Sequence, residues 1–350
     1  MTNSRQANRA AFTPILLAAA LTAMLGGCDG SSPSPDPGPT TATIDPRSFQ
    51  EGLDAVEVWL GRGDAVKAEV VAGRLVELDP GSHEALQAHG RCLLILGATA
   101  ERSGREDAAR VFRDRAADRY LEAVEAAGEV AGTGLLHEAG VAATGARRLT
   151  LALELHQRAA ALDGTDATHA IFAANVLTMM DRPREAAPWF ERAIETAPDE
   201  PWGWAGRAEC LRQLERYEEA LVAVRSARQR AITRGTESGF PFRVAEARIL
   251  REAGRPGEAA NLLFAIRADE HTLGSTRELA AACAAMDRHA KAAEAWERYN
   301  RGRPDDTASM LEAARCWMMA GEPQRAAAWL DLAESSGVEP AELDPIRSMH

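Results

Sequence analysis

Aromatic residues are scarce in this sequence: they make up 5% of its 350 residues, although 46% of the residues are apolar. The apolar residues are mainly alanine and leucine, which favour helix over strand. Small side chains also suit helices that pack closely against each other. The composition therefore predicts an all-α protein.

Basic tracts are also absent, and the formal net charge is -12. A protein that follows a phosphate backbone needs clustered lysine and arginine side chains. An acidic protein is also repelled by an anionic surface. We therefore predict no nucleic-acid partner.

Motifs for metal, cofactor or catalytic chemistry are lacking too. None of the five cysteines forms a Cys-x-x-Cys pair, and no cysteine–histidine cluster has zinc-site spacing. The eight histidines are scattered, and His83 and His89 are poorly aligned for chelation. Gly61-Arg62-Gly63 lacks the third glycine of a dinucleotide loop. We predict no metal, no cofactor and no catalytic residue.

The N-terminus has the pattern of a secretion signal. Arg5 and Arg9 precede an apolar run, Ile15 to Leu25, that is too short to span a bilayer comfortably. The run ends in Leu25-Gly26-Gly27-Cys28, which resembles the bacterial lipobox. The alternative is an ordinary signal peptide followed by a chance cysteine.

The lipobox resemblance implies that residues 1–27 are a cleaved lipoprotein signal peptide. It also implies that Cys28 carries diacylglycerol and an acylated amino group, which together anchor the protein in a lipid bilayer. We expect residues 28–48, rich in proline and serine, to form a disordered tether. The expected location is the bacterial cell envelope, outside the cytoplasm and on the periplasmic side, with the inner or outer membrane left open.

The body of the chain repeats itself. Alanines recur at a spacing of 34 residues in two registers, Ala152, Ala186 and Ala220, and Ala159, Ala193 and Ala227. A fixed period in the thirties is typical of a stacked helical solenoid.

These repeats resemble the tetratricopeptide repeat (TPR), a helix-turn-helix unit with small residues at the helix crossing and a closing proline. Residues 201–234 match best, and the likeness covers residues 49–340 as about eight units. The resemblance implies a right-handed α-solenoid, followed by a short C-terminal tail at 341–350. Residues 83–130 depart from the period through a charged insertion, so we expect extended helices there.

In the TPR family the first helix of each unit lines a concave wall that binds partners. Carried over, the matching positions are Arg91, Asn175, Trp202, Arg212, Arg248, Arg251, Arg277 and Arg315, with His137, Met179, Glu209 and Met318 among others. We expect few acidic residues opposite the arginines from Arg212 to Arg315, which favours acidic protein or peptide segments. The alternative is that these arginines only solvate the surface and pair with neighbours.

Three further expectations concern single side chains. Trp202 is expected to face the wall as an aromatic anchor, while Trp204 fits the core. Cys92, Cys210, Cys283 and Cys316 are expected to be buried thiols rather than disulfides. No pattern indicates capture of a C-terminal carboxylate.

Taken together, the sequence predicts a membrane-anchored, extracytoplasmic scaffold for protein–protein interaction without catalysis of its own. The alternative is an enzyme, or an enzyme subunit, with a noncanonical site around the 83–130 insertion. The departure from the period is the sole support for that alternative.

Overall fold

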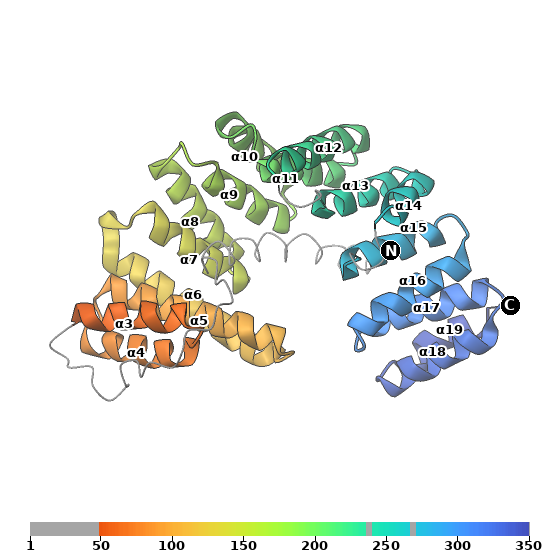
Figure 1. The fold of residues 1–350 in the computed structure, drawn as a ribbon, viewed down its shortest axis with the longest axis horizontal. Helices are drawn as coiled ribbons and strands as arrows, with labels where there is room; N and C mark the ends of the chain where they lie inside the picture. Colours follow the sequence, from red (N-terminus) through yellow and green to blue (C-terminus); the bar gives the residue numbers. More distant parts are fainter. Residues whose placement is uncertain (1–48, 236–239, 267–270, 350) are drawn as a thin grey trace. The chain divides into compact units, whose positions relative to one another are not determined.

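The computed structural model describes residues 49–235, 240–266 and 271–349, and these residues form seventeen α-helices and no strand (Figure 1). The predicted signal peptide (1–27) and the predicted tether (28–48), with Cys28, lie outside the described residues. The all-α prediction is confirmed. The chain divides into two compact units, the first ending at Ala197 and the second beginning at Pro198.

The first unit holds eight α-helices and a short 3-10 turn. They are α3 (Phe49–Gly61), α4 (Ala65–Leu78), α5 (His83–Arg102), α6 (Glu106–Ala127), η2 (Gly128–Val130), α7 (Thr133–Gly145), α8 (Leu149–Leu162), α9 (Ala167–Met179) and α10 (Pro183–Thr196). Each α-helix packs mainly on the helix before it and the helix after it. We call α3, α5, α7 and α9 the A helices of this unit, and α4, α6, α8 and α10 its B helices.

The second unit continues the same order. It holds α11 (Pro201–Gln213), α12 (Tyr217–Thr233), α13 (Phe240–Glu252), α14 (Pro256–Phe264), α15 (Leu273–Ala284), α16 (His289–Gly302), α17 (Thr307–Met319), α18 (Pro323–Ser335) and α19 (Pro340–Arg347). Its A helices are α11, α13, α15 and α17, and its B helices are α12, α14, α16 and α18. The A helices α13 and α15 also touch each other directly.

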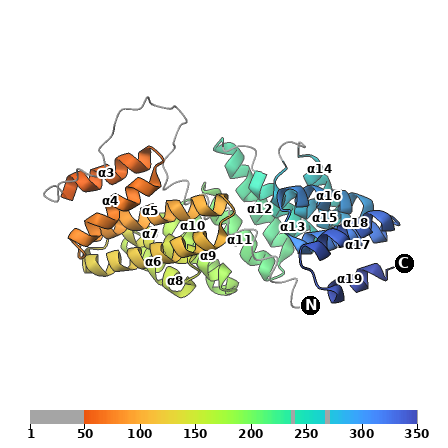
Figure 2. The ribbon, with the colours of Figure 1, turned by 90° about the horizontal axis from the view of Figure 1, so that it is seen from below.

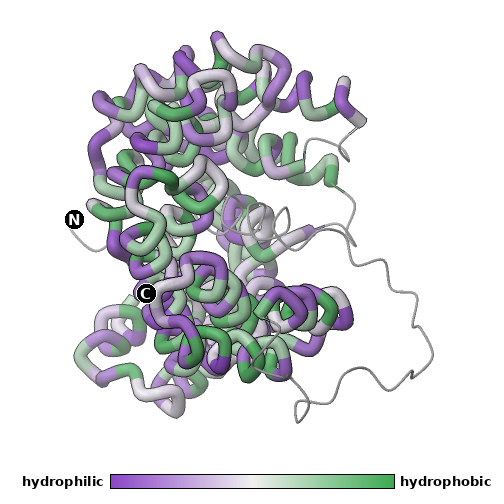
Figure 3. The backbone as a smooth tube through the Cα atoms, turned by 90° about the vertical axis from the view of Figure 1, so that its left-hand side faces the viewer, coloured by the Kyte–Doolittle hydropathy of each residue, from purple (hydrophilic) through white to green (hydrophobic). Residues whose placement is uncertain are grey.

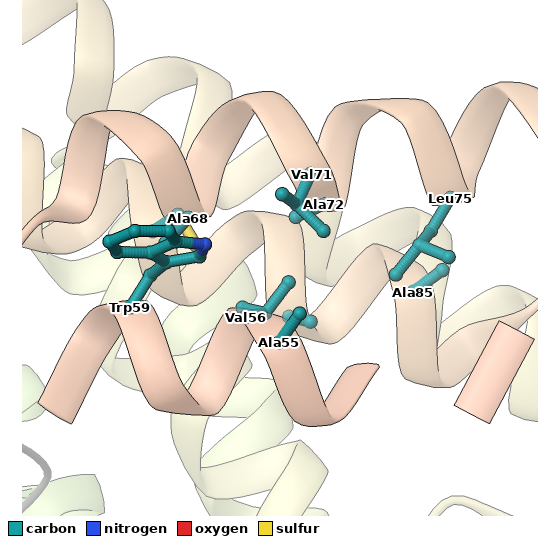
Figure 4. Packing of buried hydrophobic residues seen from close by; sticks show 10 residues of the cluster. Ala55, Val56, Trp59, Ala68, Val71, Ala72, Leu75 and Ala85 are labelled. Carbon is teal, nitrogen blue, oxygen red and sulfur yellow. The ribbon is translucent and has the colours of Figure 1, made fainter. Parts of the chain in front are cut away.

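The repeated alanines lie where the helices approach most closely. Ala152, Ala186 and Ala220 are each fully buried, and Ala159, Ala193 and Ala227 are at most 1% exposed. A methyl group is the largest side chain that such a close crossing admits, so larger residues fill the space between neighbouring pairs. At the start of the first unit, Trp59 and Leu75 fill this space around Ala68 and Ala72 (Figure 4). Hydrophobic and hydrophilic residues accordingly alternate along the helices (Figure 3).

The turns between A and B helices repeat with the same period. Arg147, Asp181 and Glu215 follow each other at intervals of 34 residues, and all three have a positive φ near 60°. Gly254 and Gly321 hold the left-handed conformation in later turns, where glycine adopts it without strain. Arg182, Gly254-Arg255 and Gly321-Glu322 lie in turns between helices, and the proline that follows each begins the next helix.

The insertion in residues 83–130 lengthens a helix pair. Helix α5 has 20 residues and α6 has 22, as expected, whereas most other helices have 12 to 14. The added turns pack against each other: a Cβ on Gly97 would lie 3.4 Å from Phe112 Cβ and 3.5 Å from the carbonyl oxygen of Ala109. The departure from the period is therefore explained by helix length.

The C-terminal residues differ from the tail expected at 341–350. Residues Pro340–Arg347 form α19, which packs on α17 and α18 (Figure 2). Leu343 and Ile346 are buried against Met310 and Leu330. Their spacing of three residues places both on one face of this short helix, which covers the end of the last pair.

Two glycines of α7 provide a test of the close packing. A Cβ on Gly140 would lie 2.5–2.8 Å from the ring of His156, whereas a Cβ on Gly134 meets nothing within 4 Å. We predict that Gly140→Ala lowers the free energy of unfolding by about 2 kcal/mol through overpacking. Gly134→Ala should raise it by up to about 1 kcal/mol through helix propensity. Urea unfolding followed by circular dichroism measures both, and equal effects would contradict the close crossing.

Candidate partner-binding site

The predicted partner-binding residues all lie on A helices. Arg91 is on α5 and Asn175 on α9 of the first unit. The others are on α11, α13, α15 and α17 of the second unit: Trp202, Arg212, Arg248, Arg251, Arg277 and Arg315. The second unit therefore carries most of the candidate site.

A chain of ion pairs joins three A helices of the second unit. Arg212 lies 2.7 Å from Glu209 on its own helix and 2.7 Å from Glu252 on α13. Arg251 lies 3.5 Å from Glu252 and 3.1 Å from Glu278 on α15. The side chains thus form one connected stripe across α11, α13 and α15, which we call the arginine stripe.

The acidic members of the stripe correct a prediction. The arginines were expected to have few acidic residues opposite them, yet Glu209, Glu252 and Glu278 pair with them. Arg315, the last predicted arginine, is half exposed and lies 3.5 Å from Glu312. Much of the positive charge is therefore balanced within the molecule, as the alternative interpretation held.

The most buried part of the stripe surrounds Glu278. Its carboxylate is 3% exposed and accepts hydrogen bonds from Arg248 Nε at 3.0 Å and Arg251 Nη2 at 3.1 Å. Burial by itself would raise the pKa of Glu278, but the nearby charges of Arg248, Arg251 and Arg277 lower it overall. Glu278 is therefore ionised at neutral pH, which keeps the arginines in place.

Two tryptophans follow each other closely on α11. Trp202 is half-buried, and its ring centroid lies 5.1 Å from that of Phe242 on α13. Trp204 was expected in the core, but it is also half-buried. Its Nε1–H donates to the carbonyl oxygen of Pro198 at 3.0 Å, and the guanidinium of Arg230 lies 4.2 Å from its ring. Trp204 is thus held by polar and cation–π contacts.

The first unit has a smaller polar network on its A helices. Arg91 lies 2.6 Å from Glu57 on α3 and 3.4 Å from Glu138 on α7. The buried hydroxyl of Tyr120 donates to Glu138 at 3.0 Å. Asn175 is half-buried, and its Nδ2 is a buried donor without a hydrogen-bond partner. The contacts of Arg91 are to Glu57 and Glu138, and Asn175 is not part of that network.

The fold can be compared with solved structures. A tetratricopeptide repeat protein from Parabacteroides merdae aligns with 87% of this chain and 98% of its own, at 14% identity and a TM-score of 0.53. A chain of the APC/C hetero-tetramer Cut9–Hcn1 aligns with 88% of this chain and 56% of its own, at 11% identity and a TM-score of 0.54. This chain has the tetratricopeptide-repeat fold. A comparison with protein-family models gave no match, and neither did one with curated proteins.

A shorter TPR structure also aligns with part of the chain. YrrB, described as a TPR protein with an unusual peptide-binding site, aligns with 53% of this chain and 93% of its own. The identity is 17% and the TM-score is 0.43. The fold is shown by the alignments with the Parabacteroides merdae protein and with Cut9–Hcn1, and these leave the partner open.

A histidine cluster joins three TPR helices of the first unit, and the sequence analysis missed it. The ring centroid of His137 on α7 lies 5.6 Å from that of His156 on α8 and 5.5 Å from that of His169 on α9. Phe172 packs edge-on against His137, with 4.8 Å between centroids. The sequence signal for this cluster is a glycine, Gly140, that leaves room for the ring of His156. Using that signal requires knowing which helices pack against each other.

Burial favours the neutral imidazole at two members of the histidine cluster, His137 and His156. His156 is fully buried, and neither ring nitrogen has a hydrogen-bond partner. Burial, with a smaller contribution from His137 and His169, lowers the pKa of His156 to about 3. Burial also lowers the pKa of His137. Within the residues described, no group of three histidine, cysteine or acidic side chains could hold a metal ion.

The cysteines of the TPR body are buried thiols, as predicted. Cys92, Cys283 and Cys316 are free thiols, and these three side chains and that of Cys210 are at most 4% exposed. Burial raises the pKa of Cys92 to about 12 and that of Cys316 to about 11. These thiols stay protonated at neutral pH and pack as small apolar side chains.

Two observations bear on the remaining sequence predictions. Among the described residues, none of the helices combines the length and apolar character needed to cross a bilayer. On the lengthened α6, a recess is lined by the charged residues Arg115, Asp118, Arg119, Glu122 and Glu125 together with Leu121. The added length of α5 and α6 accounts for the insertion in residues 83–130. That insertion was the sole support for the alternative of an enzymatic site in this segment.

The buried His156 makes the stability of the first unit depend on pH. In the unfolded chain the pKa of His156 is close to 6.5. As the pH falls below this value, the unfolded state binds a proton that the folded state does not bind. Stability is then complete above pH 6.5 and is lost as the pH falls towards 3. We predict a loss of about 2 kcal/mol between pH 7.5 and pH 5 from this group.

The variant His156→Leu separates this contribution from the rest. The difference in urea midpoint between pH 7.5 and pH 5 should be smaller in His156→Leu than in the wild type. His83→Gln removes an exposed histidine and serves as the matched control. An unchanged pH dependence in His156→Leu would contradict the assignment.

Proposed function

We propose that the protein is an interaction scaffold that binds a protein or peptide partner along its A helices, without catalysis of its own. The observation that carries the proposal is the arginine stripe, in which ion pairs link α11, α13 and α15 into one surface. Trp202 adds a half-buried aromatic ring on the first of these helices. Tryptophan and arginine are the residues that most often dominate binding energies at protein interfaces.

The ion pairs suit the stripe for recognition. Arg212 and Glu252 have side chains that are 14% and 16% exposed, so both are largely ordered before a partner arrives. Binding to ordered side chains costs less conformational entropy than binding to free ones. The remaining exposed guanidinium edges favour acidic segments of the partner.

The proposal includes a lipid anchor and an extracytoplasmic location in the bacterial cell envelope. Its support is the sequence of the N-terminus, where Cys28 follows a basic start and an apolar run. An acidic protein has no electrostatic attraction to an anionic membrane, so a covalent anchor would hold it there. The Cut9–Hcn1 complex, which shares the fold, is a hetero-tetramer and supports assembly as a role.

Partner capture tests the binding surface. We predict that Trp202→Ala reduces capture of the partner at least tenfold, because a buried aromatic contact is lost. Capture is measured by chemical crosslinking in native envelopes, pull-down and quantitative mass spectrometry. Trp189→Ala is the matched control, since Trp189 is a half-buried tryptophan on the B helix α10. Equal capture by Trp202→Ala and the wild type would overturn the proposed surface.

Fractionation tests the anchor. We expect Cys28→Ala to shift the protein from the membrane fraction to the soluble fraction and to remove the mass of the acyl groups. The lipid-anchor proposal fails if Cys28→Ala remains in the membrane fraction and its mass shows the same processing as the mass of the wild type.

A further inference from the structure

The centre of the arginine stripe has more guanidinium groups than carboxylates. Three arginines, Arg248 and Arg251 on α13 and Arg277 on α15, converge on the single carboxylate of Glu278. Arg248 is 4% exposed and Glu278 is 3% exposed, so this pair forms the floor of the cluster. We call the four residues the Glu278 cluster.

Glu278 cannot satisfy all three arginines. Its Oε1 accepts from Arg248 at 3.0 Å, and its Oε2 accepts from Arg251 at 3.1 and 3.2 Å. Arg277 Nη2 remains 3.8 Å from Oε1 and has no hydrogen-bond partner, although it is buried. A buried donor without an acceptor costs free energy, so the single carboxylate of Glu278 leaves Arg277 short of an acceptor.

The neighbouring carboxylate, that of Glu252, does not neutralise the excess positive charge of the Glu278 cluster. Glu252 lies 3.5 Å from Arg251 but 2.7 Å from Arg212, which therefore holds it more closely. Across the stripe, four arginines face three glutamates. The excess positive charge lies at Arg251 and Arg277, whose side chains are 20% and 23% exposed. The side chains of Arg251 and Arg277 are thus the more accessible side of the cluster.

We propose that Arg251 and Arg277 bind a side-chain carboxylate from an acidic segment of the partner. This proposal rests on the proposed function and names the chemistry of the partner at one position. A guanidinium pairs with a planar carboxylate through parallel N–H···O bonds, which a fixed pair of arginines presents in a defined geometry. Glu278 holds the arginines in place and keeps them from binding anions indiscriminately.

The charge of the whole protein limits the partner to a short acidic segment. The chain carries a net charge of -12, so an extended polyanion would be repelled by most of its surface. Repulsion between exposed charges falls off over about 10 Å in 0.1 M salt. One or two acidic side chains that reach the Glu278 cluster are attracted locally without this opposition.

A peptide-binding assay tests the carboxylate site. The probe is a fluorescein-labelled peptide of six glutamates, with a peptide of six glutamines as the control, and fluorescence anisotropy reports binding to the folded protein. The glutamate peptide should bind the wild type at least tenfold more tightly than the glutamine peptide. Arg277→Gln should weaken its binding about tenfold. Equal binding of the two peptides to the wild type would overturn the inference.

Two further variants separate local recognition from overall charge. Arg216→Gln removes the same charge from an exposed residue before α12, outside the stripe, and should leave binding within about twofold of the wild type. Glu278→Gln removes the competing carboxylate and should tighten binding several-fold, provided that circular dichroism shows a folded protein. Equal weakening by Arg277→Gln and Arg216→Gln, or weaker binding by folded Glu278→Gln, would overturn the site.

The two proposals fail in different ways. Absence of glutamate-peptide binding, with partner capture that still depends on Trp202, overturns the carboxylate site alone. Capture that does not depend on Trp202 overturns the proposed function.

Discussion

The close approach of the two helices in each pair is the constraint on which the rest of the structure depends. At these crossings the chain places alanine or glycine, and the alanines at 152, 186 and 220 are fully buried. Close crossing allows each helix to pack on its sequence neighbours, and repetition places successive A helices next to each other, as the contact between α13 and α15 shows. Side chains from separate repeats then meet on a shared face.

That shared face explains why polar groups converge on the A helices. Glu278 meets arginines that are 27 and 30 residues away in sequence, and Arg212 meets Glu252 across 40 residues. Each contact fixes long side chains that would otherwise be free in solution. In the first unit the same packing brings aromatic rings together, since His137, His156 and His169 come from three different helices. The fold is thus a means of assembling surfaces from residues that are distant in sequence.

The sequence predicted the features that depend on a single repeat. It did not predict the contacts that side chains of two repeats make with each other. Helix type and the burial of Cys92 and Cys316 follow from the pattern within a single unit. Glu278 was missed because it lies one residue beyond Arg277, which is the residue at the predicted wall position. Trp204 was misplaced because the backbone oxygen of Pro198, which accepts its N–H, has no sequence signature. Contacts between repeats depend on side-chain direction, which a periodic pattern leaves open.

The central claim is that the partner lies on the A helices of the second unit. Site-specific photo-crosslinking in intact cells tests it most directly, with the photoreactive residue placed at Trp202 on the A helix α11 or at Val222 on the B helix α12. Val222 is 65% exposed and is therefore fully available for crosslinking. We expect a crosslinked partner from position 202 and none from position 222. The same partner crosslinked from position 222, with none from position 202, would contradict it.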